Sequence, residues 1–229
     1  MAEFCAEHIK EHEFVYQTHL KIEDAIVILN KFWLQHITNK ELGKLRDKNF
    51  VVGDPIDSDC NLELDARLSI HSQQPGYYVT HLVDTRIPRD LKVTDKFAIG
   101  YYGTLSNTVA PAEVVCVSCY DNSVQVLGNF SAHYTVRRKI KESFKPPLKI
   151  WTAAVCNVPV LTSMDNDVPL YLKDYPYVAE TGEAAIKVLE QMRQDFGTDK
   201  WEEARQMVRA TYDDTRVVSD MREFLDGIA

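Results

Sequence analysis

The sequence contains no apolar run approaching the roughly 20 residues that a membrane-spanning helix requires. Residues 1–13 are acidic and rich in histidine, and they lack the apolar stretch of a secretory signal peptide. Cysteine is also scarce, because the 229 residues include only 5, an odd number that is widely scattered. Such usage is not that of a disulfide framework. We therefore expect a cytoplasmic protein in a reducing compartment, without an integral membrane segment.

Positive charge is the next shortage. The chain has 26 Lys plus Arg against 34 Asp plus Glu, which gives a net charge of −8. A general nucleic-acid binder needs a basic face to displace counterions, so we expect no nucleic-acid partner. At 45% hydrophobic and 26% charged, the composition is that of a globular protein with one large domain or two small ones.

Several catalytic signatures are missing from the sequence. It has no Gly-x-Gly-x-x-Gly, P-loop, Gly-x-Ser-x-Gly or HExxH motif, which disfavours simple dehydrogenases, NTPases, hydrolases and zincins. Cys116 and Cys119 form a CxxC pair with no second pair. In a strand these two thiols point to opposite faces, so a zinc or redox site is disfavoured. We expect no metal and no cofactor.

What is present is an alternation of strand and helix patterns. Short apolar runs rich in β-branched residues predict strands over 25–29, 50–53, 66–72, 77–82, 96–102, 113–120, 132–136 and 158–162. Helices are predicted over 38–47 and 146–156, and three apolar stripes of helical spacing follow between 185 and 225. This order predicts an α/β fold with parallel sheets and C-terminal helices.

A charged stretch containing Pro88, residues 84–95, reads as a linker between two Rossmann-like halves that face a cleft. We expect a reduced N-terminal, acceptor-side half over 1–90 and a C-terminal, donor-binding half over 91–229. Only four strands precede the linker, which leaves a sheet edge open for pairing. A homodimer or a partner chain is therefore expected.

The segment 137–149 carries six basic residues and one acid inside an acidic chain. A solvated loop is the ordinary explanation for such a run. Pro146 and Pro147, however, suit the first positions of a helix, which places Lys145 and Lys149 at its positive end. Free backbone N–H groups, two lysines and a nearby Arg137 would suit a diphosphate.

The residues Lys145-Pro146-Pro147-Leu148-Lys149, followed by 152–160 (TAAVCNVPV), resemble the donor-side helix and strand of two-Rossmann-domain (GT-B) glycosyltransferases. Asn157 stands where that superfamily usually has Gly, and it accepts the left-handed conformation that ends a helix. Four more stretches resemble GT-B segments in the expected order: 65–72, 81–84, 97–105 and 180–225.

The resemblance implies metal-independent hexosyl or deoxyhexosyl transfer from a nucleotide sugar to an acceptor glycan or small molecule. It assigns the donor and its phosphates to a set of residues in the second half: Gly103, Thr104, Arg137, Arg138, Lys145, Lys149 and Thr152. Asp54 and Asp57 follow a buried strand and are candidates for the catalytic base, although Asp and Pro also suit an ordinary turn.

Two alternatives stay open at this point. With its first domain cut down, the chain could be a non-catalytic nucleotide-sugar-binding module or a subunit of a larger transferase. The second alternative is a nucleotide-sugar epimerase or phosphorylase on the same scaffold.

Overall fold

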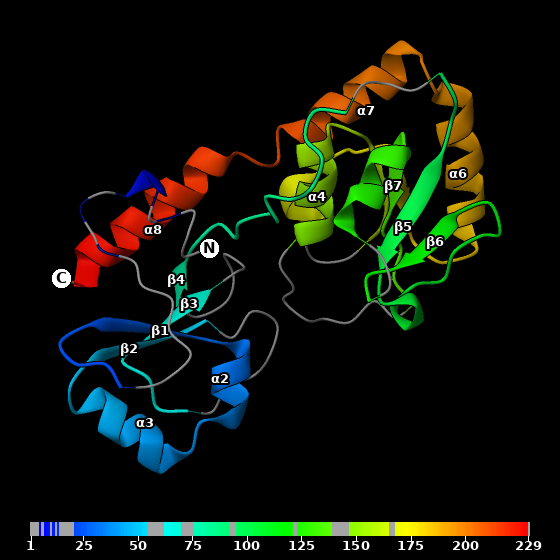
Figure 1. Ribbon diagram of the computed structural model, residues 1–229. Coiled ribbons are helices and arrows are strands. Elements are labelled where there is room, and N and C mark those ends of the chain that lie inside the picture. The colour runs from blue at the N-terminus through cyan, green and yellow to red at the C-terminus, as the bar shows by residue number, and fades with distance from the viewer. Residues whose placement is uncertain are drawn as a thin grey trace. The chain divides into compact units, whose positions relative to one another are not determined.

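The computed structural model describes residues 5, 7–9, 11, 13, 21–54, 62–69, 76–91, 95–120, 123–138, 147–164 and 168–228. The chain divides into two units, the first built from Met1–Leu82 and Asp214–Ala229 and the second from Val83–Ser143 and Pro147–Asp213. Each unit holds one parallel sheet with helices (Figure 1). The predicted α/β class with parallel sheets and C-terminal helices is confirmed.

The sheet of the first unit has four strands that pair in chain order, all parallel. They are β1 (Ile26–Asn30), β2 (Phe50–Asp54), β3 (Ala66–Ser69) and β4 (Tyr77–Tyr78). All four were predicted, but β4 has two residues where the pattern suggested a strand over 77–82. The strand β1 is also an edge strand, and its residues alternate between more and less exposed positions, so the continuous apolar run at 25–29 predicts a strand but not its burial.

Helices cover both faces of this sheet. They are α2 (Lys31–His36), α3 (Asn39–Arg46) and α8 (Asp214–Ile228). Val51 packs with Leu42 and Leu45 of α3, whereas the next residue, Val52, packs with Met221 and Phe224 of α8. Successive strand residues thus serve opposite layers, as the period of a strand requires, and Figure 1 shows α3 and α8 on opposite sides of the strands.

The start of α3 follows from a local sequence signature. The Thr38 hydroxyl oxygen accepts a hydrogen bond from the Glu41 N–H at 3.2 Å, and the Glu41 carboxylate accepts one from the Thr38 N–H at 2.9 Å. These two bonds form the capping box that the sequence predicts, and they satisfy N–H groups that a helix start leaves without partners.

The second unit has a five-stranded parallel sheet in the order β6-β5-β7-β8-β9. Its strands are β5 (Ile99–Gly103), β6 (Val115–Ser118), β7 (Ala132–Tyr134), β8 (Val160–Ser163) and β9 (Val178–Ala179). Its helices are α4 (Leu148–Cys156), α5 (Val168–Tyr171), α6 (Ala184–Asp195) and α7 (Asp199–Arg209), with 3-10 turns at η1 (Leu105–Asn107) and η2 (Val124–Asn129). The sequence did not predict β9, whose two residues are too few to form a pattern.

The core of this unit lies between the sheet and its helices, with α4 and α6 to either side of β5 and β7 in Figure 1. Trp151 of α4 is 1% exposed and its ring lies 5.5 Å from that of Tyr212. On α7, Trp201 packs edge-on against Phe97 and Phe196, with ring centroids 6.0 and 5.0 Å away. These aromatic contacts bury large apolar areas and hold α4 and α7 to the unit.

Residues 83–91 belong to the second unit. The Val83 N–H donates to the Tyr212 hydroxyl at 3.0 Å, and Asp90 and Leu91 donate their N–H groups to carbonyls at the end of α4 at 3.0 and 2.9 Å. These bonds explain why the units divide between residues 82 and 83, and not between 90 and 91 as the charge pattern suggested.

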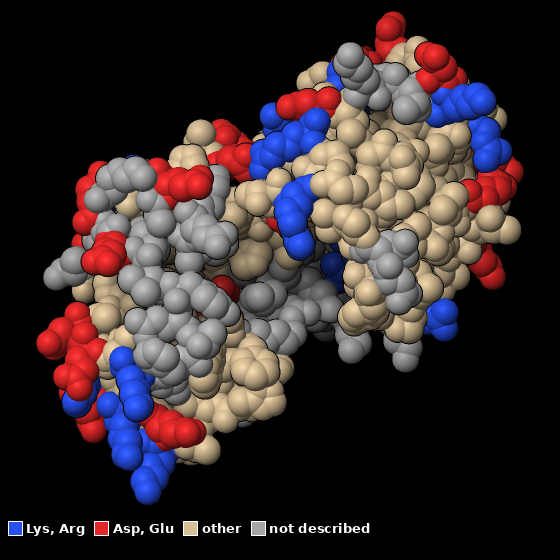
Figure 2. All heavy atoms as spheres, viewed as in Figure 1, with Lys and Arg blue, Asp and Glu red and all other residues tan. Residues whose placement is uncertain are grey.

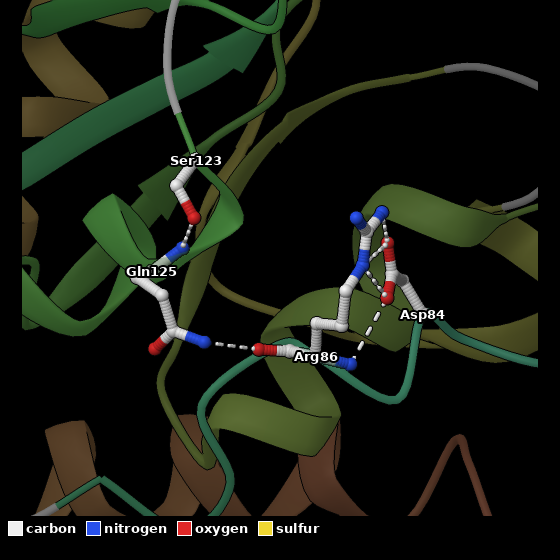
Figure 3. A network of polar contacts seen from close by, with 4 residues as sticks. All are labelled: Asp84, Arg86, Ser123 and Gln125. Atoms are coloured by element: carbon white, nitrogen blue, oxygen red, sulfur yellow. Dashed lines mark hydrogen bonds and ion pairs between the residues drawn. The ribbon is translucent and has the colours of Figure 1, made fainter.

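A polar network ties the same segment to η2 (Figure 3). The Arg86 guanidinium donates to both oxygens of the Asp84 carboxylate. The Gln125 side-chain amide donates to the Arg86 carbonyl at 2.6 Å, and Gln125 is itself oriented by Ser123. Asp84 and Arg86, two of the charged residues that suggested a linker, are thus engaged in local hydrogen bonds.

The helix α8 is the second departure from the expected boundaries, because the sequence placed all of 91–229 in the second half. Met221, Phe224 and Leu225 of α8 instead complete the core of the first unit. An apolar stripe of helical spacing predicts that a helix is amphipathic, but it does not say which sheet the helix covers.

No helix among the described residues combines the length and the apolar character that crossing a membrane requires.

Acidic and basic side chains are interspersed on the face shown in Figure 2, where the described residues form no continuous basic surface.

Candidate functional site

The strand order of the second unit creates a topological switch. From β5 the chain proceeds to β6, which pairs with one edge of β5, and then crosses to β7, which pairs with the opposite edge of β5. In an open parallel sheet, ligands bind outside the carboxyl ends of the strands at the point where the order reverses. The residues that follow β5 and β7 are therefore expected to line a binding site.

Gly103 ends β5 at this point. Its φ of +159° is one that residues with side chains rarely adopt, and a Cβ here would lie 2.8 Å from the Tyr101 hydroxyl and 3.1 Å from the Lys149 ammonium. The Lys149 ammonium lies 3.8 Å from the centre of the Tyr101 ring, a cation–π contact. Glycine lets these groups approach the strand end closely, and the structure thereby brings Gly103 and Lys149 together.

Tyr101 supports this arrangement from inside the sheet. It is 1% exposed, and its hydroxyl donates to the Thr104 carbonyl at 2.9 Å. Burial raises the pKa of Tyr101 to about 12, while the positive charge of Arg137 opposes the rise. Tyr101 is therefore a neutral donor that holds the Gly103–Thr104 turn, and Arg137 lies within electrostatic reach of it.

Helix α4 presents its N-terminus after β7. The helix begins at Leu148, with Pro147 as N-cap, so Lys149 is its second residue. The helix thus starts slightly later than the predicted range 146–156. Among the described residues no side chain caps this end, and its first turn holds no acid. Asn157 ends the helix with the predicted left-handed conformation (φ 61°). A helix start leaves its first N–H groups without intrahelical partners, and such groups can bind an anion.

The two arginines after β7 have different surroundings. Arg138 is exposed and its backbone and guanidinium donate to the carbonyls of Asn107 and Thr108 at 3.0 and 3.4 Å. Arg137 is half-buried and its N–H donates to the Ser163 hydroxyl at 3.4 Å, at the end of β8. Arg138 therefore fixes the loop at residues 107 and 108, and Arg137 is the better placed of the two for a ligand at the switch point.

The remaining predicted donor residues are only partly joined to this cluster. Thr104 follows Gly103 directly, and its hydroxyl donates to the Tyr120 hydroxyl at 3.4 Å. Thr152 lies one residue beyond the first turn of α4 and is half-buried. Lys145 lies outside the described residues, and so does Asp57.

In the first unit, Asp54 ends β2 and His81 follows β4. Burial lowers the pKa of His81, and the negative charge of nearby Asp54 opposes this shift. The two groups therefore lie close enough to interact at the carboxyl edge of the sheet, where a carboxylate paired with an imidazole can accept a proton. The described residues hold no group of three or more His, Cys, Asp or Glu side chains that could bind a metal ion.

The chain matches no family model and no curated protein. The chemistry of these two strand edges is therefore what indicates a function.

Sequence reasoning missed the supporting aromatic residues. Tyr101 lies within the strand predicted over 96–102 and Tyr120 at the end of the strand predicted over 113–120, and neither pattern assigns a role to these side chains. The position of Tyr101 beneath Lys149 joins residues 48 positions apart, and neither spacing nor composition signals such a contact. Gly103, directly after the strand predicted over 96–102, is the residue that permits this close approach.

Proposed function

We propose that the protein is a glycosyltransferase that uses a nucleotide-sugar donor and binds its diphosphate at the carboxyl edge of the second unit. The observation that carries the proposal is the close approach of Lys149 to Gly103 at the end of β5, with Arg137 following β7 on the other side of the switch point. The proposal also implies a fold of the two-Rossmann-domain GT-B type.

The chemistry follows from charge. Transfer breaks the bond between the sugar and the diphosphate, which leaves with additional negative charge, and forms a bond to an acceptor oxygen. Lys149, Arg137 and the first N–H groups of α4 would stabilise that developing charge through preorganised positive groups. Arg137 can also contact two phosphate oxygens at once, which a lysine cannot do.

The proton of the acceptor hydroxyl must also be removed. Asp54 is the residue we assign as general base, with His81 beside it as the group that modulates its charge. Asp57 is a second candidate for the general base. No metal ion takes part in these steps as we propose them.

The donor site is tested by calorimetric titration of a nucleoside diphosphate. Lys149→Ala and Arg137→Ala should each weaken binding about ten- to a hundredfold, because each removes a charge-assisted contact worth about 1.5–3 kcal/mol. Lys187→Ala, which removes an exposed lysine from α6, is the matched control and should leave the affinity unchanged. Equal affinities in all three variants and the wild type would contradict the proposed site.

A nucleotide-sugar-binding module, acting as a subunit of a larger transferase, is the second candidate function. It is favoured by the fact that Lys149 and Arg137, which we propose as phosphate ligands, both belong to the second unit. The Asp54→Asn variant separates the two functions. In a transferase this variant should lose turnover of the nucleotide sugar and keep donor affinity, whereas a binding module shows no turnover even as the wild type.

A further inference from the structure

Tyr120 follows β6 at the carboxyl edge of the second sheet. It is 80% exposed, more than any other large hydrophobic side chain in the described part of the chain. Single exposed apolar residues are common on protein surfaces, so exposure alone assigns no role. The contacts of Tyr120 with the turn after β5 are what indicate its role.

The position of Tyr120 is held by hydrogen bonds from its own backbone N–H, from that of the preceding residue and at its hydroxyl. The Tyr120 N–H donates to the Ser118 hydroxyl at 3.2 Å, and the preceding Cys119 N–H donates to the Gly103 carbonyl at 3.2 Å. The Tyr120 hydroxyl accepts from the Thr104 hydroxyl at 3.4 Å. The ring is therefore anchored beside the end of β5 while most of its surface stays open to solvent.

These anchors connect the ring to the cationic cluster. The Thr104 carbonyl accepts a hydrogen bond from Tyr101 at 2.9 Å, and the Lys149 ammonium lies over the ring of Tyr101 at 3.8 Å. An exposed aromatic ring and a positively charged centre thus adjoin the same turn, Gly103–Thr104. A nucleoside diphosphate offers the complementary pair, an aromatic base at one end and phosphates at the other.

We infer that Tyr120 stacks against the base of the nucleoside diphosphate whose phosphates lie at Lys149, an inference that rests on the proposed function. Stacking on an aromatic side chain is tolerant of base identity, because every base has a π face. Tyr120 would therefore add affinity for any nucleotide without choosing among bases. Leu105, which follows Thr104 and is 46% exposed, extends the apolar surface around this turn.

The test is calorimetric titration of the full chain with uridine diphosphate, adenosine diphosphate and inorganic pyrophosphate. Tyr120→Ala should raise the dissociation constants of both nucleotides about five- to a hundredfold, the usual contribution of one stacked base. It should leave pyrophosphate binding unchanged, because pyrophosphate has no base. Tyr120→Phe keeps the ring and should bind the nucleotides within about threefold of the wild type.

Each other outcome has a definite meaning. Equal nucleotide affinities for Tyr120→Ala and the wild type would overturn the stacking role and leave the phosphate site standing. An equal loss for pyrophosphate and nucleotides would also overturn it, since Tyr120 would then act on the phosphate site itself. Failure of the wild type to bind any of the three probes would overturn the proposed function together with this inference.

Discussion

The two sheets are both parallel, yet their carboxyl edges differ in topology and in charge. In the first unit the strands pair in chain order, β1 to β4, and the edge holds Asp54 and His81. In the second unit the order reverses around β5, and the edge holds Lys149 and Arg137. Only a reversal sends consecutive connections in opposite directions and opens a crevice at the strand ends.

The sequence pattern that predicts a strand therefore does not show which strand end forms a binding site. Both halves contain short β-branched runs followed by polar loops, and the sequence treats them alike. The second sheet acquires an anion-binding edge because the reversal brings the turn after β5 against the start of α4. The first sheet, without a reversal among its described strands, offers a carboxylate and an imidazole instead.

The largest effect is expected from a substitution that unfolds one unit and leaves the other folded. Phe224 of α8 is 3% exposed and packs in the first-unit core, with its ring 5.2 Å from that of Tyr77. Phe224→Ala should cost about 3–5 kcal/mol through lost burial and the cavity it leaves. Hydrogen exchange should then show β1–β3 losing protection while β5–β8 keep theirs.

The matched control is Ile186→Ala on α6, where the side chain is 48% exposed. It should change the free energy of unfolding by no more than about 0.5 kcal/mol. Equal loss of protection in both sheets after Phe224→Ala would show that the units unfold as one.

Acid should affect the two units differently, because His133 of the second unit is buried and His81 of the first unit is half-buried. Burial lowers the pKa of His133 in β7 from 6.5 to about 4, with a hydrogen bond to the Leu127 backbone opposing the shift. As pH falls below 6.5 the unfolded chain takes up this proton and the folded chain does not. The second unit should therefore lose about 3 kcal/mol of stability between pH 6.5 and 4.

The first unit should respond less, because the negative charge of Asp54 opposes the lowering of the His81 pKa. Hydrogen exchange measured across this pH range compares the two units directly, and the NMR titration of the His133 ring reports its pKa independently. His133→Leu should flatten the acid response of the second unit. A His133 ring that titrates near 6.5 in the folded protein would contradict the prediction.

The smallest expected change in stability comes from replacing a glycine in each unit. Gly103→Ala should destabilise the second unit by about 1–3 kcal/mol, because it forces a side chain into positive φ and against the Tyr101 hydroxyl. It should also weaken nucleoside diphosphate binding by displacing Lys149. Gly43→Ala in α3 meets no atom within 4 Å and should instead stabilise the first unit by about 0.5–1 kcal/mol.

Thermal or chemical unfolding of the two glycine variants, with a nucleoside diphosphate titration of each, makes this comparison. A neutral Gly103→Ala substitution would show that the turn after β5 is not a constrained feature of the site.

The sequence by itself determined the features that depend on neighbours along the chain. The Thr38–Glu41 capping box, the left-handed Asn157 and the strands β1, β2 and β5 all follow from residues a few positions apart. Each is governed by backbone conformation or by the burial of one short segment, so local chemistry is sufficient to predict it.

Tertiary structure alone decided which segments meet. It assigned α8 to the first unit, held residues 83–91 to the second, and placed the Lys149 ammonium over Tyr101 beside Gly103. An apolar stripe has the same free energy of burial against either sheet as far as its own sequence is concerned. The choice comes from the complementary surface that the rest of the chain provides, and that surface exists only in the folded protein.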